Sequence, residues 1–445
     1  MRNTTRAAAA SLAALLILAG CGKEIEQQER TPVISRDKVT TAEETTASED
    51  TAVTEEEEKP AVTSAPKKDE SSAAETKKKK ADPDKINVGC MDTVEVYQQV
   101  KLSEFMFDSN AKLKNGDELL DTETLGEHEV KLKLELDGGE AEKKVTYNVV
   151  DSTPPVMMLG DQISISNGAY FDPNEHISYA DNYDRNPVMS WEGEVDTSEN
   201  GTYPITVYIS DNSGNLIVRD VSVIVADAVS DPYYDDSSIY FGDFVAQYDA
   251  PGREFGIDIS RWQGEIDFGA VAAEGCTFAI MRMGYGEAGG ADLDGCYYGN
   301  MAGALENGLQ VGVYFYSTDT TQEGARATAK RIIDVLDGQK LDFPVAFDWE
   351  EFQTFQNYGM SLHDLSEVYE AFADELEKNG YDAMLYSSKN FLEMCWENKK
   401  NRPVWLAHYV NETTYGGDWL LWQRCGTGKI SGINGVVDLN VLQRE

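Results

Sequence analysis

The pattern of hydrophobic and polar positions changes twice along this chain of 445 residues. Residues 22–85 contain almost no aromatic side chains and few apolar runs. Between residues 86 and 227, apolar and polar residues alternate with the period of two that is typical of half-buried strands. From residue 253 onwards, continuous apolar runs alternate with segments of helical periodicity. The pattern therefore predicts a multidomain protein, and a length of this order suits about three domains.

The alternating region contains a sequence repeat. Residues 121–151 align with residues 196–227, and each copy reads as a strand, a glycine-containing turn and a second strand. The matched positions are Asp121 with Asp196 and Gly126 with Gly201. The second copy, with DSTPP, ADN and SDNSGN, resembles bacterial surface immunoglobulin-like domains. We expect two small all-β sandwiches, at 86–151 and 152–227, that serve as spacers rather than as ligand-binding domains.

The C-terminal region reads as a β/α barrel. Its apolar runs suit strands that are buried on both faces. The predicted strands are 255–260, 277–284, 310–317, 344–350, 381–388, 403–409, 419–425 and 435–442. The clearest helix spans about 362–379, with Ser361 as N-cap and Gly380 at its end. Only the segments between the first strands are long enough for helices, so we expect an irregular α/β (TIM-like) barrel over 253–445, after a connector at 228–252.

Carboxylates fall at the ends of these predicted strands. In PVAFDWEEF (344–352), Asp348 and Glu350 are spaced i, i+2 and point the same way on a strand, with Cα atoms roughly 6.5–7 Å apart. Asp258 lies in the first predicted strand and Asp438 in the last, and these strands are neighbours in a closed barrel. Because active sites of such barrels lie where strands end in loops, we expect the four acids at one rim. Mutual repulsion would raise at least one pKa.

Two structural alternatives explain the same acids without chemistry. The stretch 344–352 reads equally as a strand that ends in a solvated loop. The acids could also belong to a structural ion-pair network, for which Arg261, Arg282 and Arg424 are available.

Charge and composition exclude several classes of function. The formal charge of −41 opposes binding to nucleic acid. Only four histidines occur, without HExxH or Cys-x-x-Cys, so we expect neither a metal nor a cofactor. Of the six cysteines, those at 276, 296, 395 and 425 could form disulfides after export or remain buried thiols.

The N-terminus reads as an export signal. A basic start and an apolar run too short to span a bilayer precede Leu18-Ala19-Gly20-Cys21, which resembles the bacterial lipobox. This resemblance implies a lipoprotein signal peptide with its lipobox at residues 1–21, cleavage just before Cys21, lipid attached to Cys21 and a protein tethered to the outer face of the cytoplasmic membrane. A plain secretory signal is the alternative. Residues 22–85 then form a disordered linker, because they offer too little apolar surface to offset the entropy cost of folding.

A set of motifs in 253–445 resembles the glycoside hydrolase family 25 lysozymes. The motifs occur in order: GIDISRWQGEIDF (256–268), FAIMRMGYG (278–286), GVYFYS (312–317), FPVAFDWE (343–350), WLAHY (405–409), LWQ (421–423) and GVVDLN (435–440). The resemblance implies that Asp258, Asp348, Glu350 and Asp438 are the active-site acids and that Glu350 donates the proton. It also implies cleavage of the β-1,4 bond between N-acetylmuramic acid and N-acetylglucosamine in peptidoglycan glycan strands.

Aromatic side chains near the predicted rim are candidates for stacking on sugar rings. They are Tyr285, Tyr316, Tyr386, Trp405 and Trp422. The sequence departs from the family at Phe315, where a histidine is common, and at His408 and Cys425. These departures affect the expected substrate preference more than the reaction.

Two other functions are compatible with the sequence. The barrel could have lost activity and serve as a surface adhesin or wall-binding protein, or it could hydrolyse another N-acetylglucosamine polymer such as chitin. The complete set of four acids argues against the first alternative. The sequence indicates no protein partner.

Overall fold

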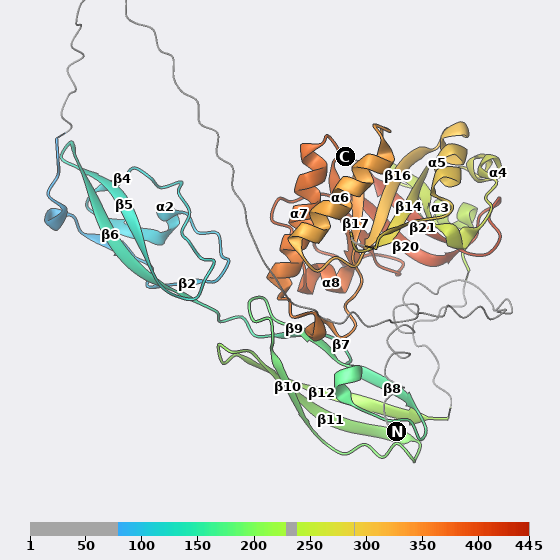
Figure 1. The fold of residues 1–445 in the computed structure, drawn as a ribbon, viewed down its shortest axis with the longest axis horizontal. Helices are drawn as coiled ribbons and strands as arrows, with labels where there is room; N and C mark the ends of the chain where they lie inside the picture. The colour runs from blue at the N-terminus through green and yellow to red at the C-terminus, as the bar shows by residue number, and fades with distance from the viewer. Residues whose placement is uncertain (1–78, 228–237, 289, 445) are drawn as a thin grey trace, which may run out of the picture.

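A computed structural model describes residues 79–227, 238–288 and 290–444 (Figure 1). The predicted signal peptide with Cys21, most of the predicted linker and part of the predicted connector lie outside the described residues. Within the described residues, every helix is too short or too polar to cross a membrane.

The first β domain contains a four-stranded and a two-stranded sheet. In the larger sheet, the long hairpin β5 (Gly126–Leu136) and β6 (Gly139–Val150) is flanked by β4 (Lys112–Leu113) and by β2 (Thr93–Glu95), which pairs with β6 in parallel. The other elements are η1 (Pro83–Lys85), β1 (Val88–Cys90), α2 (Leu102–Phe105) and β3 (Met106–Ser109). Its core includes Leu132, Leu134 and Tyr147.

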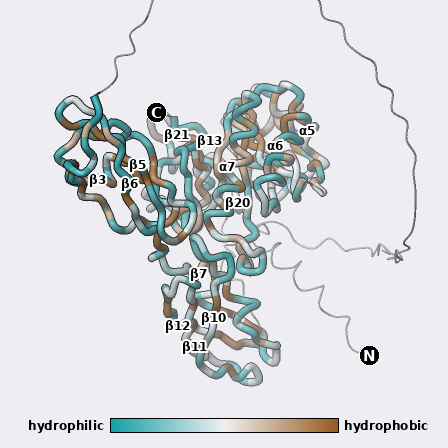
Figure 2. The backbone as a smooth tube through the Cα atoms, turned by 60° about the vertical axis from the view of Figure 1, so that its left-hand side comes forward, coloured by the Kyte–Doolittle hydropathy of each residue, from teal (hydrophilic) through white to brown (hydrophobic). Residues whose placement is uncertain are grey.

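The second β domain repeats this arrangement. Its elements are β7 (Val156–Leu159), β8 (Gln162–Ser166), η2 (Pro173–Glu175), β9 (Ser178–Ala180), β10 (Val188–Glu192), β11 (Gly201–Ser210) and β12 (Leu216–Ala226). The sheet order β10-β11-β12-β8 matches β4-β5-β6-β2, again with one parallel pair at the end. Gly126 and Gly201, which the repeat aligned, begin β5 and β11. Hydrophobic stretches run along the strands of both β domains (Figure 2).

The C-terminal domain is a closed eight-stranded barrel. Its strands are β13 (Arg253–Ile259), β14 (Phe278–Gly286), β16 (Gln310–Ser317), β17 (Val345–Asp348), β18 (Ala383–Ser388), β19 (Val404–Ala407), β20 (Leu421–Gly428) and β21 (Val437–Gln443), with β15 (Asp292–Leu293) added to β14. The barrel strands β13, β14 and β16 to β20 run parallel, whereas β21 pairs antiparallel with both β20 and β13 and so closes the barrel. Each predicted strand is present, and the first and last strands are neighbours as expected.

Helices cover the outside of the barrel after each of the first five barrel strands in chain order. They are α4 (Phe268–Ala273), α5 (Tyr297–Glu306), α6 (Gln322–Leu336), α7 (Leu362–Lys378) and α8 (Lys389–Met394), with the short turns η3 (Arg261–Gln263) and η4 (Phe355–Tyr358). Ser361 caps α7 through a capping box with Asp364, as the sequence predicts. An additional helix, α3 (Phe241–Tyr248), lies in the range expected to be connector. Because its Phe241 and Phe244 are buried in the hydrophobic layer that surrounds the barrel strands, the connector prediction of 228–252 extends too far.

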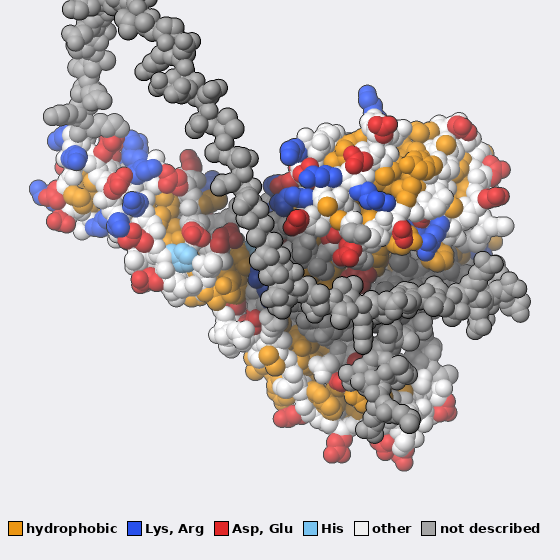
Figure 3. Space-filling view, viewed as in Figure 1, with side chains coloured by type: hydrophobic (Ala, Val, Ile, Leu, Met, Phe, Trp, Pro, Cys, Tyr) orange, Lys and Arg blue, Asp and Glu red, His pale blue; other side chains and the backbone are white. Residues whose placement is uncertain are grey.

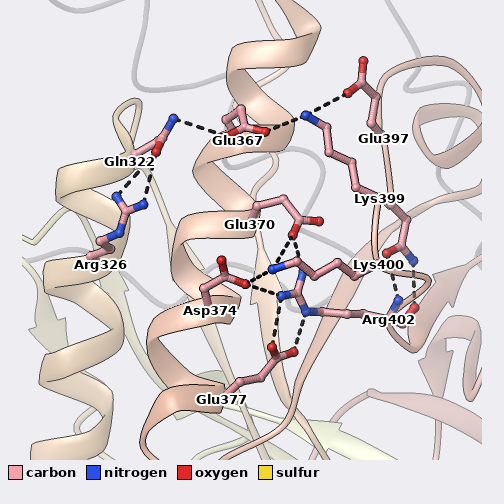
Figure 4. Close-up of polar contacts among 11 residues, drawn as sticks. Gln322, Arg326, Glu367, Glu370, Asp374, Glu377, Glu397, Lys399, Lys400 and Arg402 are labelled. Carbon is pink, nitrogen blue, oxygen red and sulfur yellow. Dashed lines mark hydrogen bonds and ion pairs between the residues drawn. The ribbon is translucent and has the colours of Figure 1, made fainter. Parts of the chain in front are cut away.

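Ion pairs fix the outer face of α7 to the loop before β19 (Figure 4). The guanidinium of Arg402 is buried and contacts Glu370, Asp374 and Glu377, whose side chains project from successive turns of α7. Lys400 also pairs with Asp374. A buried charge is tolerated only when it is paired, so this cluster holds the loop in one position.

The second β domain contacts the barrel around the loop that follows β17. Gln356 in η4 donates to the carbonyl of Ile177 at 3.1 Å, and the hydroxyl of Ser178 donates to the carbonyl of Phe352. Arg185 forms a two-point ion pair with Asp364 at the start of α7, at 2.6 and 2.8 Å. Figures 1 and 2 show β7 beside the barrel, at the end of the second β domain that faces it. The view in Figure 3 shows acidic and basic side chains interspersed on the barrel surface.

Candidate active site

The four predicted acids line one cavity at the mouth of the barrel. The cavity has a volume of about 590 Å³ and opens at the end where the parallel strands finish. Asp258, Asp348, Glu350 and Asp438 all contribute to its wall. Residues more than 170 positions apart in the sequence thus share one solvent-accessible space.

Asp258 and Asp438 lie directly opposite each other on paired strands. Asp258 is near the end of β13, whereas Asp438 is near the start of β21. Because β21 runs antiparallel, its start lies at the same rim as the ends of the other strands, and the two Cα positions are in register. Their carboxyl groups form a hydrogen bond, which requires one proton between them. Burial raises the pKa of Asp258 to about 6, and burial with the charge of Asp258 raises the pKa of Asp438.

Asp348 is the last residue of β17, and Glu350 follows it two positions later. Asp348 is buried, and its Oδ1 atom has no hydrogen-bond partner. Burial and the nearby charge of Glu350 raise the pKa of Asp348, while Arg282 opposes this shift. Glu350 is partly exposed to the cavity. Burial and the charges of Glu351 and Asp258 raise its pKa to about 7. Glu350 therefore holds a proton up to neutral pH, as a general acid must.

The structural ion-pair alternative does not fit this geometry. Within the described part of the chain, no lysine or arginine forms an ion pair with any of the four acids. Arg282 pairs with Asp294, Arg261 donates to the hydroxyl of Tyr285, and Arg424 donates to the hydroxyl of Tyr248. The acids are therefore held close together without neutralising partners, which raises their pKa values at the expense of stability.

Amide side chains that the sequence analysis overlooked hold Asp258 in place. Its Oδ2 atom accepts hydrogen bonds from Asn440 at 2.7 Å and from Gln423 at 3.0 Å. The carbonyl oxygen of Gln423 in turn accepts from the hydroxyls of Tyr386 and Tyr409, each at 2.8 Å. The sequence does contain a signal for Asn440, because it lies two positions after Asp438 on a strand and so projects to the same face.

The predicted aromatic residues occupy different positions. Tyr285, Tyr316, Tyr386 and Trp405 line the cavity. Trp405 is 1% exposed and donates to Asn440 at 2.8 Å, so it forms the floor of the site rather than an open platform.

Trp422 does not line the cavity. It lies on the outer face of β20, where it donates to the carbonyl of His408 and packs in the layer between barrel and helices. Its neighbour Gln423 takes the inward position, because successive side chains of a strand point to opposite faces. The expectation that Trp422 stacks on sugar is therefore corrected.

Two exposed aromatic residues at the mouth were not predicted. Trp262 and Tyr409 are 58% and 56% exposed, and both line the cavity. Glu351 also lines it and accepts a hydrogen bond from Tyr316 at 2.8 Å. Trp262 lies within the GIDISRWQG motif, but the sequence does not reveal that its ring stays open to solvent.

The described cysteines are all unpaired. Cys276, Cys395 and Cys425 are buried, and Cys90 and Cys296 are partly buried. Of the two alternatives for the C-terminal cysteines, the structure shows free thiols.

Comparisons with known proteins agree with this reading of the barrel. The model of glycosyl hydrolases family 25 matches residues 257–433. The chain is 30% identical over 189 residues to a protein named autolytic lysozyme from Clostridium acetobutylicum, covering 42% of this chain but only 54% of that protein. It is 31% identical over 196 residues to the uncharacterized protein YegX from Escherichia coli K12, covering 42% of this chain and 68% of YegX.

A solved structure of a family 25 glycosyl hydrolase from Bacillus anthracis aligns with 43% of this chain and 89% of its own, at 21% identity and a TM-score of 0.39. The matched family segment carries three of the cavity acids, Asp258, Asp348 and Glu350, and Asp438 lies just beyond its end. Through its barrel, this chain belongs to glycosyl hydrolases family 25.

Proposed function

We propose that this protein hydrolyses the β-1,4 bond between N-acetylmuramic acid and N-acetylglucosamine in peptidoglycan. The observation that carries the proposal is the convergence of four carboxyl groups without cationic partners in one open cavity. Glycoside hydrolysis needs one carboxylic acid to protonate the leaving oxygen and a second carboxylate near the anomeric centre. Membership of family 25 and the name of the autolytic lysozyme support this choice of reaction and substrate.

Glu350 is the general acid in this proposal. Its pKa of about 7 keeps the carboxyl protonated at neutral and acidic pH, and its partial exposure lets it reach a glycosidic oxygen bound in the cavity. When the bond breaks, the proton passes from Glu350 to the leaving oxygen. The carboxylate that remains takes a proton from the incoming water and so returns to its starting state.

Asp348 is the second carboxyl group. Its buried Oδ1 atom has no hydrogen-bond partner and is available to a bound substrate. As the glycosidic bond breaks and Glu350 gives its proton to the leaving oxygen, the positive charge that develops at the anomeric carbon stabilises Asp348 as an anion. Asp348 then acts directly on that carbon or orients the N-acetyl group of the substrate.

Asp258 and Asp438 position the substrate and maintain the charge state of the other two acids. The amides of Gln423 and Asn440 both donate to Asp258 and so favour its ionised form. The proton of this pair therefore resides mainly on Asp438, which donates it in the hydrogen bond to Asp258. Around these acids, Trp262 and Tyr409 offer exposed ring faces to the sugar units on either side of the cleaved bond.

We further propose that lipid on Cys21 tethers the protein to the outer face of the bacterial membrane. The lipobox-like sequence supports this placement. The residues between Cys21 and the two β domains, together with these domains, would then let the barrel reach the wall. Replacement of Cys21 by serine should move the protein from the membrane fraction to the soluble fraction of cells. An unchanged distribution would rule out the anchor.

Mass spectrometry of digested peptidoglycan tests the reaction. The proposed cleavage releases fragments whose new reducing end is N-acetylmuramic acid. Fragments that end in N-acetylglucosamine would contradict the assigned bond, and faster turnover of chitin than of peptidoglycan would contradict the assigned substrate. Binding to the wall without release of any fragment would instead support the adhesin alternative.

A further inference from the structure

Three buried aspartates meet where the two β domains join each other. Asp151 directly follows β6 of the first domain, and Asp181 and Asp211 directly follow β9 and β11 of the second. One carboxylate oxygen from each lies within 4.8 Å of the others. All three side chains are more than nine-tenths buried, and Asp181 is only 1% exposed. The cluster is separate from the barrel cavity and plays no part in the proposed reaction.

Local hydrogen bonds orient these carboxylates but leave two of their oxygens without a hydrogen-bond partner. Asp181 accepts two backbone hydrogen bonds at Oδ1, from Tyr183 at 2.9 Å and from Asp184 at 2.7 Å. Its Oδ2 atom is buried and has no partner. Asp151 likewise accepts from the backbone of Thr153 at Oδ1, and its Oδ2 atom is buried without a partner. Each side chain is thus fixed through one oxygen, and the other oxygen lacks the hydrogen bond that burial ordinarily demands.

Asn215 holds the third carboxylate of the cluster, that of Asp211, in place. Its backbone and side-chain nitrogens both donate to Asp211, at 2.8 Å, and its side chain also donates to the carbonyl of Asp151 at 3.2 Å. In the part of the chain that the structure describes, no lysine or arginine forms an ion pair with any of the three acids. Three carboxyl groups are therefore buried together without a cationic side chain, an arrangement that costs stability when they are ionised unless a cation joins them.

We propose that Asp151, Asp181 and Asp211 bind a calcium ion at the junction of the β domains. The ligands are all oxygen, which suits a hard cation and disfavours zinc or copper. Two oxygens that bind calcium at about 2.4 Å from it lie at most about 4.8 Å apart, so the observed spacing fits one shared ion. Calcium accepts six to eight oxygens in flexible geometry, so water completes the shell around the three carboxylates.

The position of the cluster gives the ion a structural consequence. The carbonyl of Asp181 accepts a hydrogen bond from the backbone of Leu362 at 2.8 Å, at the start of barrel helix α7. The next helix residue, His363, stacks on Tyr97 of the first β domain with ring centroids 3.3 Å apart. An ion at the cluster therefore lies where all three domains meet. It would hold them as one extended body, which suits spacers that carry a catalytic domain away from its anchor.

We expected no metal from the sequence because histidines are few and paired cysteines are lacking. A site built from three aspartates in separate loops carries no such local motif. The segments ADN (180–182) and SDNSGN (210–215) had pointed only to an immunoglobulin-like domain.

Calcium titration of the full-length protein tests the proposal. After treatment with EDTA and buffer exchange, titration calorimetry with CaCl₂ should show one ion per chain, with a Kd of roughly 1 mM or tighter, as in extracellular calcium modules. CaCl₂ should also raise the melting temperature, because an ion that binds only the folded state stabilises it. MgCl₂ should bind more weakly, because the smaller ion requires stricter geometry.

The variants Asp181→Asn and Asp151→Asn should each weaken calcium binding at least tenfold. The matched control Asp161→Asn, an exposed aspartate of the second β domain, should bind as the unaltered protein does. In EDTA, Asp181→Asn should melt no lower than the unaltered protein, because the amide keeps the shape and removes a repelling charge. The proposal is overturned if calcium neither binds nor raises the melting temperature at about 10 mM, tenfold above the expected range. It is equally overturned if both variants bind calcium as well as the control.

Discussion

Replacement of Glu350 by glutamine should lower the catalytic rate without destabilising the folded protein. Glutamine has the same shape but carries no proton that it can transfer to a leaving oxygen. General acid catalysis contributes about 10²- to 10⁴-fold to rate, which corresponds to about 2.7–5.4 kcal/mol of transition-state stabilisation. We therefore expect kcat on peptidoglycan to fall by at least about a hundredfold, with little change in KM.

The same change should stabilise the folded protein at alkaline pH. In the fold, the pKa of Glu350 is raised from 4.5 to about 7, mainly by burial. As the pH rises, Glu350 ionises near pH 4.5 in the unfolded chain but only near pH 7 in the folded protein. The free energy of unfolding of the unaltered protein therefore falls between these two pH values and does not recover above them. At about 1.4 kcal/mol per pKa unit, the loss is at most about 3.5 kcal/mol, and the partial exposure of Glu350 reduces it. At pH 8 the Glu350→Gln variant should therefore be more stable than the unaltered protein, and below pH 4 the two should be equal.

Two assays check these expectations together. Release of reducing ends from purified peptidoglycan between pH 4 and 9 gives the rate, and urea denaturation at pH 4 and pH 8 gives the free energy of unfolding. For the unaltered enzyme, kcat/KM should decline above pH 7 as Glu350 loses its proton. The exposed acid Glu306 on α5 provides a control, because Glu306→Gln should change neither quantity. The reasoning fails if Glu350→Gln retains more than a tenth of the activity, or if it is less stable at pH 8.

Further substitutions test the surroundings of the site and of the fold. Glu351→Gln removes a charge that raises the pKa of Glu350, so the alkaline decline in kcat/KM should begin at lower pH; an unchanged profile would show that this charge does not reach Glu350. Trp262→Ala should raise KM by about two- to tenfold with kcat nearly unchanged, because it removes an aromatic contact worth about 0.5–1.5 kcal/mol. An unaltered KM would show that Trp262 does not contact the sugar. Arg402→Met leaves the buried Glu370 with only Lys400, at 3.7 Å, as a cationic partner, so urea denaturation should show a loss of up to about 3–5 kcal/mol, and a loss below about 1 kcal/mol would contradict the role of the Arg402–Glu370 pair.

The sequence predicted the barrel well because its strands are buried on both faces. Inward residues such as Ile280 and Ala346 pack inside the barrel, while their neighbour Phe347 packs against the helices, so each strand appears as a continuous apolar run. The capping box at Ser361 marked the start of α7 for a similar reason, since both hydrogen bonds are local. The prediction failed at α3 because Phe241, Phe244 and Tyr248 recur at helical spacing over only eight residues, a stretch too short for the periodicity to distinguish a packed helix from a connector.

The candidate site was only partly visible in the sequence. Two-residue periodicity places Asp258 and Asp438 on the same faces as their second neighbours, but it does not tell which face is turned inward. This ambiguity explains why Trp422 was expected in the cavity that Gln423 occupies.

By itself, the sequence determined the order of the elements, the chemical types of the four acids and their places at strand ends, because these follow from local periodicity and composition. Only the tertiary structure decided that the last strand runs antiparallel, that Arg282 pairs with Asp294 instead of an active-site acid, and that three aspartates from separate loops meet. Those features depend on closure of the barrel and on packing between domains. Such contacts join residues far apart in the chain, and no local pattern of residues specifies them.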